Sequence, residues 1–341
     1  MTKRARLLIL VFCAVLFFVV APYIIIDALG YKFDFEQKKI VATGGIYVKA
    51  LPLGANITID SKISNKTSFL SPTVFVQNLL PKQHNILIKK EGYFDYRKNL
   101  QVKEKEVTKL EKVILFKEKI SFEILTNKAD SPFLKKELET TLPISILKKV
   151  LAFDVLSNNI IWLDQKGNLN STSQDGKTTE KLSQIPLKII AGGSYKLKII
   201  SQKIFLLENN NLLLFDPKTK TFEIFYSPAK DLKVSPDGQK ILYCNDNEIL
   251  YSYLNSEKLE RIFLNRFSGK IGDCFWLNDD YLIFNLDGKI VISETDNRDN
   301  TNIVTLQQAF SPTDKIFLNQ QDKKLYISTK DNVLVSEKLI P

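Results

Sequence analysis

The chain has 341 residues, of which 44% are hydrophobic and 25% are charged, with 13 glycines and 12 prolines. This composition excludes a wholly disordered chain, a collagen-like chain and a small disulfide-stapled domain, and the length is typical of about two domains. One histidine, three cysteines and one methionine leave few residues for metal or nucleophile chemistry.

The net charge of +10 is confined to the N-terminal third of the chain. Basic residues exceed acidic ones by 6 to 3 in residues 1–40 and by 13 to 6 in residues 41–117, whereas residues 118–341 carry 29 of each. Only 6 of the 48 basic residues are arginine, which nucleic-acid readers use for bidentate contacts to bases and phosphates. A large neutral region with so few arginines argues against a nucleic-acid partner.

The N-terminal residues have the pattern of a membrane anchor. Residues 7–26 are uncharged and mostly apolar, and an α-helix of this length spans about 30 Å, the thickness of the hydrocarbon core of a bilayer. Three basic residues precede the run and Asp27 is the first charge after it, so the positive-inside rule places the N-terminus in the cytoplasm and the rest of the chain outside. We therefore expect a single-pass cell-membrane protein with an anchor that includes Leu7, Phe12, Phe17, Val20 and Ile26.

A cleaved signal peptide is the alternative interpretation of this segment. Its apolar stretch is usually about 7–15 residues long and ends in small residues at a cleavage site. The run here is longer, and Pro22 directly follows the small residue Ala21. The pattern favours an uncleaved anchor over a signal peptide or a buried soluble helix, but it leaves open whether the segment is ever removed.

Residues 44–104 consist of short segments in which apolar and polar residues alternate. Ile46 and Val48 share one face of a strand, and Ile57 and Ile59 share a face of the next. Prolines and glycines separate these segments, as they do between strands that turn back on one another. The pattern predicts a small antiparallel β-sandwich.

The same segment resembles the PEGA domain family, which is named for a Pro-Glu-Gly-Ala turn. A Pro-Leu-Gly-Ala turn stands at residues 52–55, and a Leu-Pro turn at residues 80–81 and a Gly-Tyr pair at residues 92–93 follow in the family's order. Leu53 replaces the family's glutamate, and Lys82 stands where the family usually has glycine. The family is a surface module without catalytic residues, so the resemblance implies a structural role for the motif residues Pro52, Gly54, Ala55, Gly92 and Tyr93.

A unit made of an apolar strand, a polar turn and a second apolar strand recurs five times after residue 157. Aligned positions in the five units are 44, 37, 41 and 34 residues apart. A period near 40 residues with about four strands per unit is typical of β-propeller blades. We expect equivalent buried positions in successive blades for the aligned residues Ile160, Ile204, Ile241, Leu282 and Ile316.

These repeats resemble a diverged form of the WD40-like propellers of bacterial surface and periplasmic proteins, since no Trp-Asp dipeptide is present. A further apolar strand at residues 120–125 either closes the ring or belongs to an incomplete blade, so five or six blades are expected; an open β-sandwich is the competing fold. The sequence thus predicts an all-β protein with a cytoplasmic tip and transmembrane helix (residues 1–30), a PEGA-like β-sandwich (41–117) and a β-propeller (118–341).

The sequence contains no motif for a catalytic, cofactor or metal site. His84 has no second histidine or nearby cysteine with which to share a metal, and no glycine-rich phosphate loop leads from a strand into a helix. Cys244 and Cys274 lie in apolar strands, where the sequence leaves open a disulfide or two buried thiols. We therefore expect a protein that is not an enzyme and that binds no cofactor.

These features predict a membrane-anchored, surface-exposed protein whose propeller binds a protein or a polysaccharide. An extracytoplasmic propeller hydrolase and a purely structural cell-envelope protein are the alternatives. Residues 41–117 carry a net charge of +7 close to the membrane, which points to contact with anionic lipid or an acidic wall polymer.

Overall fold

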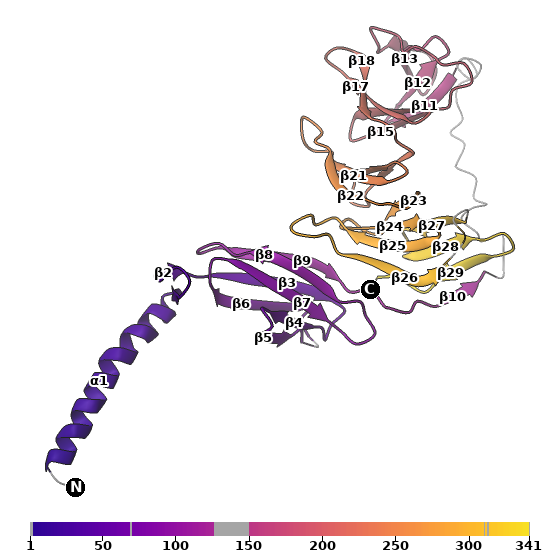
Figure 1. Cartoon of the computed structure of the whole chain (residues 1–341). Helices are drawn as coiled ribbons and strands as arrows, with labels where there is room; N and C mark the ends of the chain where they lie inside the picture. The colour runs from indigo at the N-terminus through magenta and orange to yellow at the C-terminus, as the bar shows by residue number, and fades with distance from the viewer. Residues whose placement is uncertain (1–2, 69, 126–149, 310, 312–313, 341) are drawn as a thin grey trace. The chain divides into compact units, whose positions relative to one another are not determined.

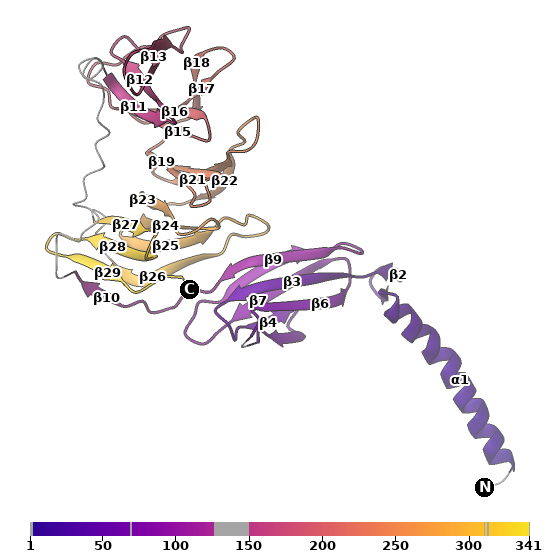
Figure 2. The same cartoon turned by 180° about the vertical axis from the view of Figure 1, so that it is seen from behind.

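The computed structural model describes residues 3–68, 70–125, 150–309, 311 and 314–340. The chain divides into two compact units. Unit 1 comprises Met1–Lys119, Asn297–Asn302 and Ile340–Pro341, and unit 2 comprises Ile120–Asp296 and Ile303–Leu339. Figures 1 and 2 show the elements of each unit from opposite sides.

Unit 1 begins with the helix α1 (Lys3–Ala28), which is long and apolar enough to cross a membrane. None of its described side chains is buried in the protein, and the helix is apolar around its whole circumference. A short hairpin of β1 (Tyr31–Asp34) and β2 (Lys39–Ala42) follows it.

The rest of unit 1 is a sandwich of two sheets, which confirms the β-sandwich predicted for this segment. One sheet has the order β6-β3-β9 and the other the order β5-β4-β7-β8. Alternate residues on both sheets face a shared apolar core, because successive side chains of a strand point to opposite faces. The strands are β3 (Gly44–Leu51), β4 (Asn56–Ile59), β5 (Ile63–Lys66), β6 (Thr73–Leu79), β7 (Gln83–Lys89), β8 (Tyr96–Gln101) and β9 (Val107–Ile114).

One strand pair differs from the expected antiparallel arrangement. Strands β3 and β9 run parallel, with Ile46 opposite Thr108 and Leu51 opposite Ile114. The chain leaves β8 in one sheet and crosses to the other sheet before it forms β9, so β9 is not the second arm of a hairpin.

Unit 2 contains five four-stranded sheets within the described residues. Four of them are simple meanders in chain order, in which each strand pairs antiparallel with the next. The first two consist of β11 (Val150–Leu156), β12 (Asn159–Asp164), β13 (Leu169–Ser173) and β14 (Thr179–Lys181), then β15 (Tyr195–Ile200), β16 (Lys203–Glu208), β17 (Asn211–Asp216) and β18 (Thr221–Tyr226). The next two consist of β19 (Asp231–Val234), β20 (Lys240–Cys244), β21 (Glu248–Tyr253) and β22 (Ile262–Arg266), then β23 (Ile271–Trp276), β24 (Tyr281–Leu286), β25 (Lys289–Glu294) and β26 (Ile303–Ala309).

The fifth sheet joins the two ends of the propeller region. Its order is β10-β29-β28-β27, so β10 (Phe122–Ile124) completes a sheet formed by β27 (Lys315–Asn319), β28 (Lys324–Ser328) and β29 (Val333–Ser336). Phe122 lies opposite Ser336 in this pairing. The apolar strand expected at residues 120–125 therefore closes the last sheet, as one strand does in many β-propellers; residues 126–149 lie outside the described part of the chain.

Successive sheets of unit 2 share apolar cores. One cluster joins the sheet of β11 to that of β15, a second joins the sheet of β15 to that of β19, and a third joins the sheet of β19 to that of β23. Repeated four-stranded meanders packed in chain order are the architecture of β-propeller blades. The all-β propeller fold predicted from the repeats is thereby confirmed, with five blades in the described residues.

The predicted repeat register is right for four positions and wrong for one. Ile160, Ile204, Ile241 and Leu282 are buried on β12, β16, β20 and β24, each the second strand of its sheet. Ile316 is buried too, but it lies on β27, which is the edge strand of the fifth sheet. The preceding strand, β26, pairs with β25 in the fourth sheet, and among the described residues β27 is paired within its sheet with β28 alone.

Candidate functional site

The two halves of the PEGA motif meet at one end of the sandwich. Lys90 connects them, because its Nζ donates a hydrogen bond to the Leu53 carbonyl at 2.7 Å and lies 5.3 Å from the centre of the Tyr93 ring. Ala55, at the end of the first turn, is fully buried, and its backbone N–H donates to Thr67 Oγ1 at 2.9 Å. Pro52 follows Leu51 through a cis peptide bond.

The two glycines of the motif are required by backbone conformation. Gly54 has φ = +80° and Gly92 has φ = +78°, in the left-handed region that residues with a Cβ rarely adopt. A Cβ at Gly92 would meet no atom within 4 Å, and one at Gly54 would meet only the end of the Lys66 side chain. Both glycines therefore serve turn geometry rather than close packing.

The motif also holds the segment by which the chain leaves the sandwich. Leu115 N–H donates to the Leu51 carbonyl at 2.8 Å, Phe94 N–H to the Phe116 carbonyl at 2.9 Å, and Glu118 N–H to the Gly92 carbonyl at 3.0 Å. The Tyr93 ring packs against the apolar core beside them. This geometry gives the motif a structural role at the exit of the domain, and no catalytic group is part of it.

His84 closes another part of the sandwich. Its Nδ1 lies 2.6 Å from Asp60 Oδ2 and its Nε2 lies 2.8 Å from the Leu80 carbonyl, and the side chain is buried. Asp60 also accepts a hydrogen bond from Asn85 N–H at 2.9 Å. Burial acts to raise the pKa of Asp60, but the hydrogen bonds from His84 and Asn85 outweigh it and hold the pKa below 3.8.

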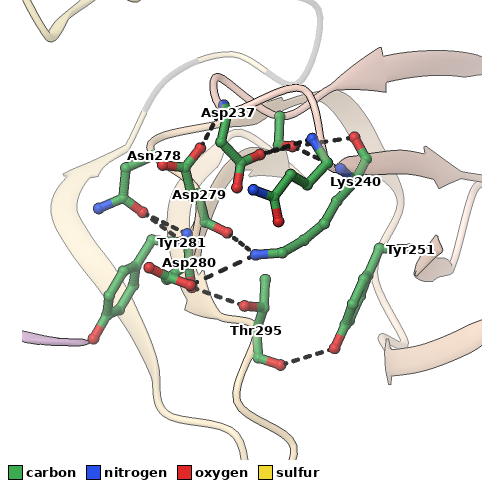
Figure 3. A network of polar contacts seen from close by, with 10 residues as sticks. Asp237, Lys240, Tyr251, Asn278, Asp279, Asp280, Tyr281 and Thr295 are labelled. Atoms are coloured by element: carbon green, nitrogen blue, oxygen red, sulfur yellow. Dashed lines mark hydrogen bonds and ion pairs between the residues drawn. The ribbon is translucent and has the colours of Figure 1, made fainter. Parts of the chain in front are cut away.

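A buried lysine joins two sheets of unit 2 (Figure 3). Lys240, on β20, extends its ammonium toward Asp279 and Asp280, which precede β24 in the next sheet. Lys240 Nζ donates to the Asp279 carbonyl, lies 3.6 Å from Asp280 Oδ1 and is 5.6 Å from the centre of the Trp276 ring.

The same network includes the Ser-Pro-Asp-Gly turn at residues 235–238, whose Asp237 N–H donates to Asp279 Oδ1 at 2.8 Å. Ser235 Oγ accepts a hydrogen bond from Lys240 N–H at 2.9 Å, which fixes the start of β20. On the other side, Thr295 Oγ1 donates to the Asp280 carbonyl at 3.2 Å. All polar groups named in this network have partners, so the network links two sheets and offers no free group to a ligand. We call these contacts around Lys240 the Lys240 clamp.

Charged side chains also collect on the first strands of neighbouring sheets. Asp154 on β11 accepts a hydrogen bond from Ile199 N–H on β15 at 2.7 Å, and Lys196 on β15 lies 3.7 Å from Asp231 on β19. Burial, together with the nearby Lys196, lowers the pKa of Lys198. Such contacts between first strands fix neighbouring sheets in order, as the Lys240 network does.

A groove of about 680 Å³ in unit 2 is a candidate ligand site. Three segments line it: the turn between β15 and β16, the hairpin of β17 and β18, and the loop after β21. Its apolar side chains are Ile204, Leu214, Phe215, Ile224, Phe225 and Leu259, and its charged ones are Lys203, Asp216, Lys218, Glu223, Glu257 and Lys258. Three lysines and three acidic residues make the lining electrically balanced.

The sequence prediction did not include this groove or the Lys240 clamp. The groove combines residues 201–204 with residues 257–259, and no local pattern indicates that these two segments meet. The exposure of Ile224, at 69%, had no signal in the sequence either, because its same-face neighbours Phe222 and Tyr226 are aromatic. Among the described residues, no group of three or more His, Cys, Asp or Glu side chains is placed to hold a metal ion.

The predicted anchor residues all lie on α1. Leu7, Phe12 and Phe17 are more than half exposed, and Ile26 is partly covered. An exposed helix with apolar side chains on every face is the pattern of a segment surrounded by lipid.

Comparison with known families identifies one segment of the chain. Residues 43–115 match the model of the PEGA domain, which confirms the resemblance inferred from the turn motifs. None of the curated proteins matches the chain.

Several solved structures are similar at low identity. YCF48 from Cyanidioschyzon merolae is 14% identical, with 86% of this chain and 98% of that chain covered and a TM-score of 0.38. The β-propeller domain of Cps50 (Swd1) from Myceliophteria thermophila is 10% identical, with 53% and 66% covered and a TM-score of 0.37. The extracellular domain of a hybrid two-component system from B. thetaiotaomicron is 10% identical, with 56% of this chain covered and a TM-score of 0.41. This chain spans only 28% of the length of that last protein. At these scores the likenesses carry no argument about function.

Proposed function

We propose that this surface-type propeller protein is anchored in the cell membrane by α1, carries its other domains outside the cytoplasm, and binds a macromolecular ligand without catalysing a reaction. The observation that carries the anchoring is the helix α1, whose described side chains are all unburied although most of them are apolar. Transfer of such a surface into lipid removes the cost of exposing it to water.

The topology is tested with a reporter enzyme that is active only outside the cytoplasm, fused after Pro341. We expect activity in the full chain and none when Lys3, Arg4 and Arg6 are moved to follow Asp27, because the excess of basic residues sets the orientation. An inactive reporter on a stable full-length fusion would refute the proposed topology. A mature N-terminus after residue 26 would instead show a cleaved signal peptide.

The proposed ligand site is the groove along β18. This strand is the last in its sheet order, so it contributes a sheet edge to the groove, together with Glu223, Ile224 and Phe225. A sheet edge beside apolar side chains suits an extended polypeptide, which adds main-chain hydrogen bonds to side-chain burial. Of the protein and polysaccharide ligands expected for the propeller, these features favour a protein.

A photo-crosslinking amino acid placed at position 224 in cells tests this site. Position 124 on β10 is a matched control, because Ile124 is 59% exposed on an edge strand of another sheet and does not line the groove. We expect a protease-sensitive adduct at position 224 and none at position 124. Equal adducts at both positions, or none at either, would refute the groove as the site, and an adduct that resists protease but not a glycan hydrolase would identify a polysaccharide.

The basic charge of the PEGA domain supports a contact with anionic lipid or wall polymer. Every residue of edge strand β5 is exposed, including Lys66 at its end, and Lys62 directly precedes it. The apolar side chains of Ile63 and Leu70 are also exposed, Ile63 by 37% and Leu70 by 91%. Lysines next to exposed apolar groups are suited to a lipid surface, where each contributes up to about 1 kcal/mol within a Debye length.

A chain lacking residues 1–30 should therefore sediment with anionic vesicles at low salt and be released as the salt concentration rises. The variant Lys62→Glu/Lys66→Glu should bind less, while Lys218→Glu/Lys258→Glu in unit 2 serves as a control with the same change in charge. Equally strong binding to neutral vesicles would contradict this contact.

A panel of glycosidase and peptidase substrates tests the proposal that the protein does not catalyse a reaction. Turnover of any of these substrates would overturn that proposal.

A further inference from the structure

Two cysteines from neighbouring sheets of unit 2 lie side by side in one core. Cys244 is the last residue of β20 and Cys274 lies on β23, and both side chains are buried as free thiols. Both belong to one apolar core cluster, which also contains Leu242 and Phe284. The only other cysteine of the chain, Cys13, lies on α1.

The backbone around the two thiols is fixed on both sides. Ile271 N–H, at the start of β23, donates to the Asp246 carbonyl just beyond β20 at 2.7 Å. Lys230 adds a second link, because its Nζ donates to the Ile271 carbonyl and lies 2.5 Å from the Asp246 carboxylate. These links hold the strands that carry the cysteines at a fixed separation.

We propose that Cys244 and Cys274 are a disulfide-forming pair, which becomes a covalent link between the third and fourth sheets when the protein folds in an oxidising compartment. Its occurrence in cells rests on the location proposed above for unit 2, whereas the ability of the two residues to form the bond does not. Disulfides are stable outside the cytoplasm and are reduced within it.

The oxidant in this proposal is an organic disulfide, either a small molecule or an oxidoreductase that carries one. The thiolate of one of the two cysteines attacks one sulfur of the oxidant, which forms a mixed disulfide and releases the first thiol. The thiolate of the other cysteine then attacks the Sγ of the first and releases the second thiol, so that two protein thiols are oxidised and one disulfide is reduced to two thiols.

In the folded protein the neighbouring Cys274 lowers the pKa of Cys244 against the effect of burial, whereas burial and the neighbouring Cys244 both raise the pKa of Cys274. These shifts belong to the closed state, so either thiol can react first when the sheets are apart. Since both side chains are buried, the exchange takes place before the two sheets close on one another or when they open.

The test uses the full chain with Cys13→Ser, purified in detergent and incubated with oxidised glutathione in a denaturant concentration that opens unit 2 reversibly. After complete denaturation without reductant, a maleimide should label neither remaining cysteine, and peptide mapping should find residues 244 and 274 linked. We expect the oxidised protein to unfold at a temperature about 5–10 °C higher than the reduced one. The single variants Cys244→Ser and Cys274→Ser should each stop at a mixed disulfide with glutathione, seen as one glutathione adduct per chain by intact mass, and should form no internal link.

Two maleimide labels per chain after oxidation, or a link only between different molecules, would overturn the proposal. The state of the thiols in cells is a separate readout. If the purified protein forms the bond but the two thiols are alkylated in freshly lysed cells, the disulfide-forming geometry stands and the proposed extracytoplasmic location is refuted.

Discussion

The two units of this protein use buried polar side chains in different places. In unit 1, His84 on β7 contacts Asp60, which directly follows the neighbouring strand β4 of the same sheet, where Ile59 lies opposite Ile86. In unit 2, Lys240 reaches from β20 to Asp280 in the next sheet, and Asp273 on β23 accepts a hydrogen bond from Ile316 N–H on β27 at 3.1 Å. The propeller thus has polar contacts between sheets in addition to contacts within a sheet such as Tyr243 Oη to Ser252 Oγ at 2.9 Å, whereas the His84–Asp60 contact of the PEGA domain lies within one sheet.

The difference follows from how each fold could assemble wrongly. The two sheets of the sandwich have one shared core, and hydrophobic burial alone brings them together. The five sheets of unit 2 have similar apolar faces, and a non-directional force distinguishes poorly between correct and incorrect neighbours. Directional hydrogen bonds and charge pairs between particular sheets supply that distinction, as polar groups do in other repetitive assemblies.

The largest effect should come from Lys240→Ala. The substitution removes the cation that faces Asp280 and the Asp279 carbonyl in a buried site, and the loss of one partner of such a pair costs about 3–5 kcal/mol of unfolding free energy. Both tryptophans, Trp162 and Trp276, lie in unit 2, so tryptophan fluorescence during urea unfolding reports on this unit alone.

The matched control is Lys270→Ala, because Lys270 is exposed and lies 3.8 Å from Asp246. It should change the unfolding free energy by no more than about 0.5 kcal/mol. If the two variants lose similar amounts of unfolding free energy, the buried lysine between the sheets stabilises unit 2 no more than a surface lysine does. The contrast between the two units would then fail.

A core truncation should affect the two units alike. Ile241→Ala in unit 2 and Ile57→Ala in unit 1 each remove a fully buried side chain and should cost about 2–5 kcal/mol. Only Ile241→Ala should move the tryptophan transition, while Ile57→Ala should accelerate amide hydrogen exchange in β4 and β7. Ile224→Ala, at a 69% exposed position, is the control and should cost less than about 0.5 kcal/mol. A tryptophan transition displaced equally by all three variants would show that the units do not unfold separately.

The sequence predicted local features of both units and missed the contacts between distant segments. The turn at residues 52–55 and the strands around Ile57 and Ile86 were predictable, because turn chemistry and alternation act over a few residues. The partner of Lys240 could not be predicted, since Asp280 is forty residues away in another sheet. Ile316 was placed on the wrong strand because a strand-turn-strand pattern is the same at the start of a sheet and in its middle.

A smaller effect is expected from Gly92→Ala. An alanine at φ = +78° costs about 1–2 kcal/mol even though its Cβ would meet no neighbour. Gly92→Asn should cost less, because asparagine adopts the left-handed region more readily.

The control is Gly192→Ala in unit 2. Gly192 has φ = +72°, and a Cβ there would also meet no atom within 4 Å. Hydrogen exchange should show the loss in the sandwich for Gly92→Ala and in unit 2 for Gly192→Ala; a loss in both units for either variant would contradict the local role of the PEGA motif.

The smallest effect should be the response of the two units to acid. The pKa of Asp60 in the folded protein is below its usual value of 3.8, so its contribution is complete above that value and is lost as the pH falls through the lower folded pKa. Burial also acts to raise the pKa of Asp231 in unit 2, but the nearby Lys233 outweighs it and lowers the pKa. Both units should therefore lose stability below about pH 4.

Two substitutions test this expected loss of stability in acid. Asp60→Asn should reduce it in the sandwich alone, measured by hydrogen exchange. Asp231→Asn should reduce it in unit 2 alone, measured by the tryptophan transition. If Asp60→Asn leaves the acid dependence of the sandwich unchanged, the His84–Asp60 pair does not stabilise that sheet, and the contrast between contacts within sheets and contacts between sheets rests on Lys240 only.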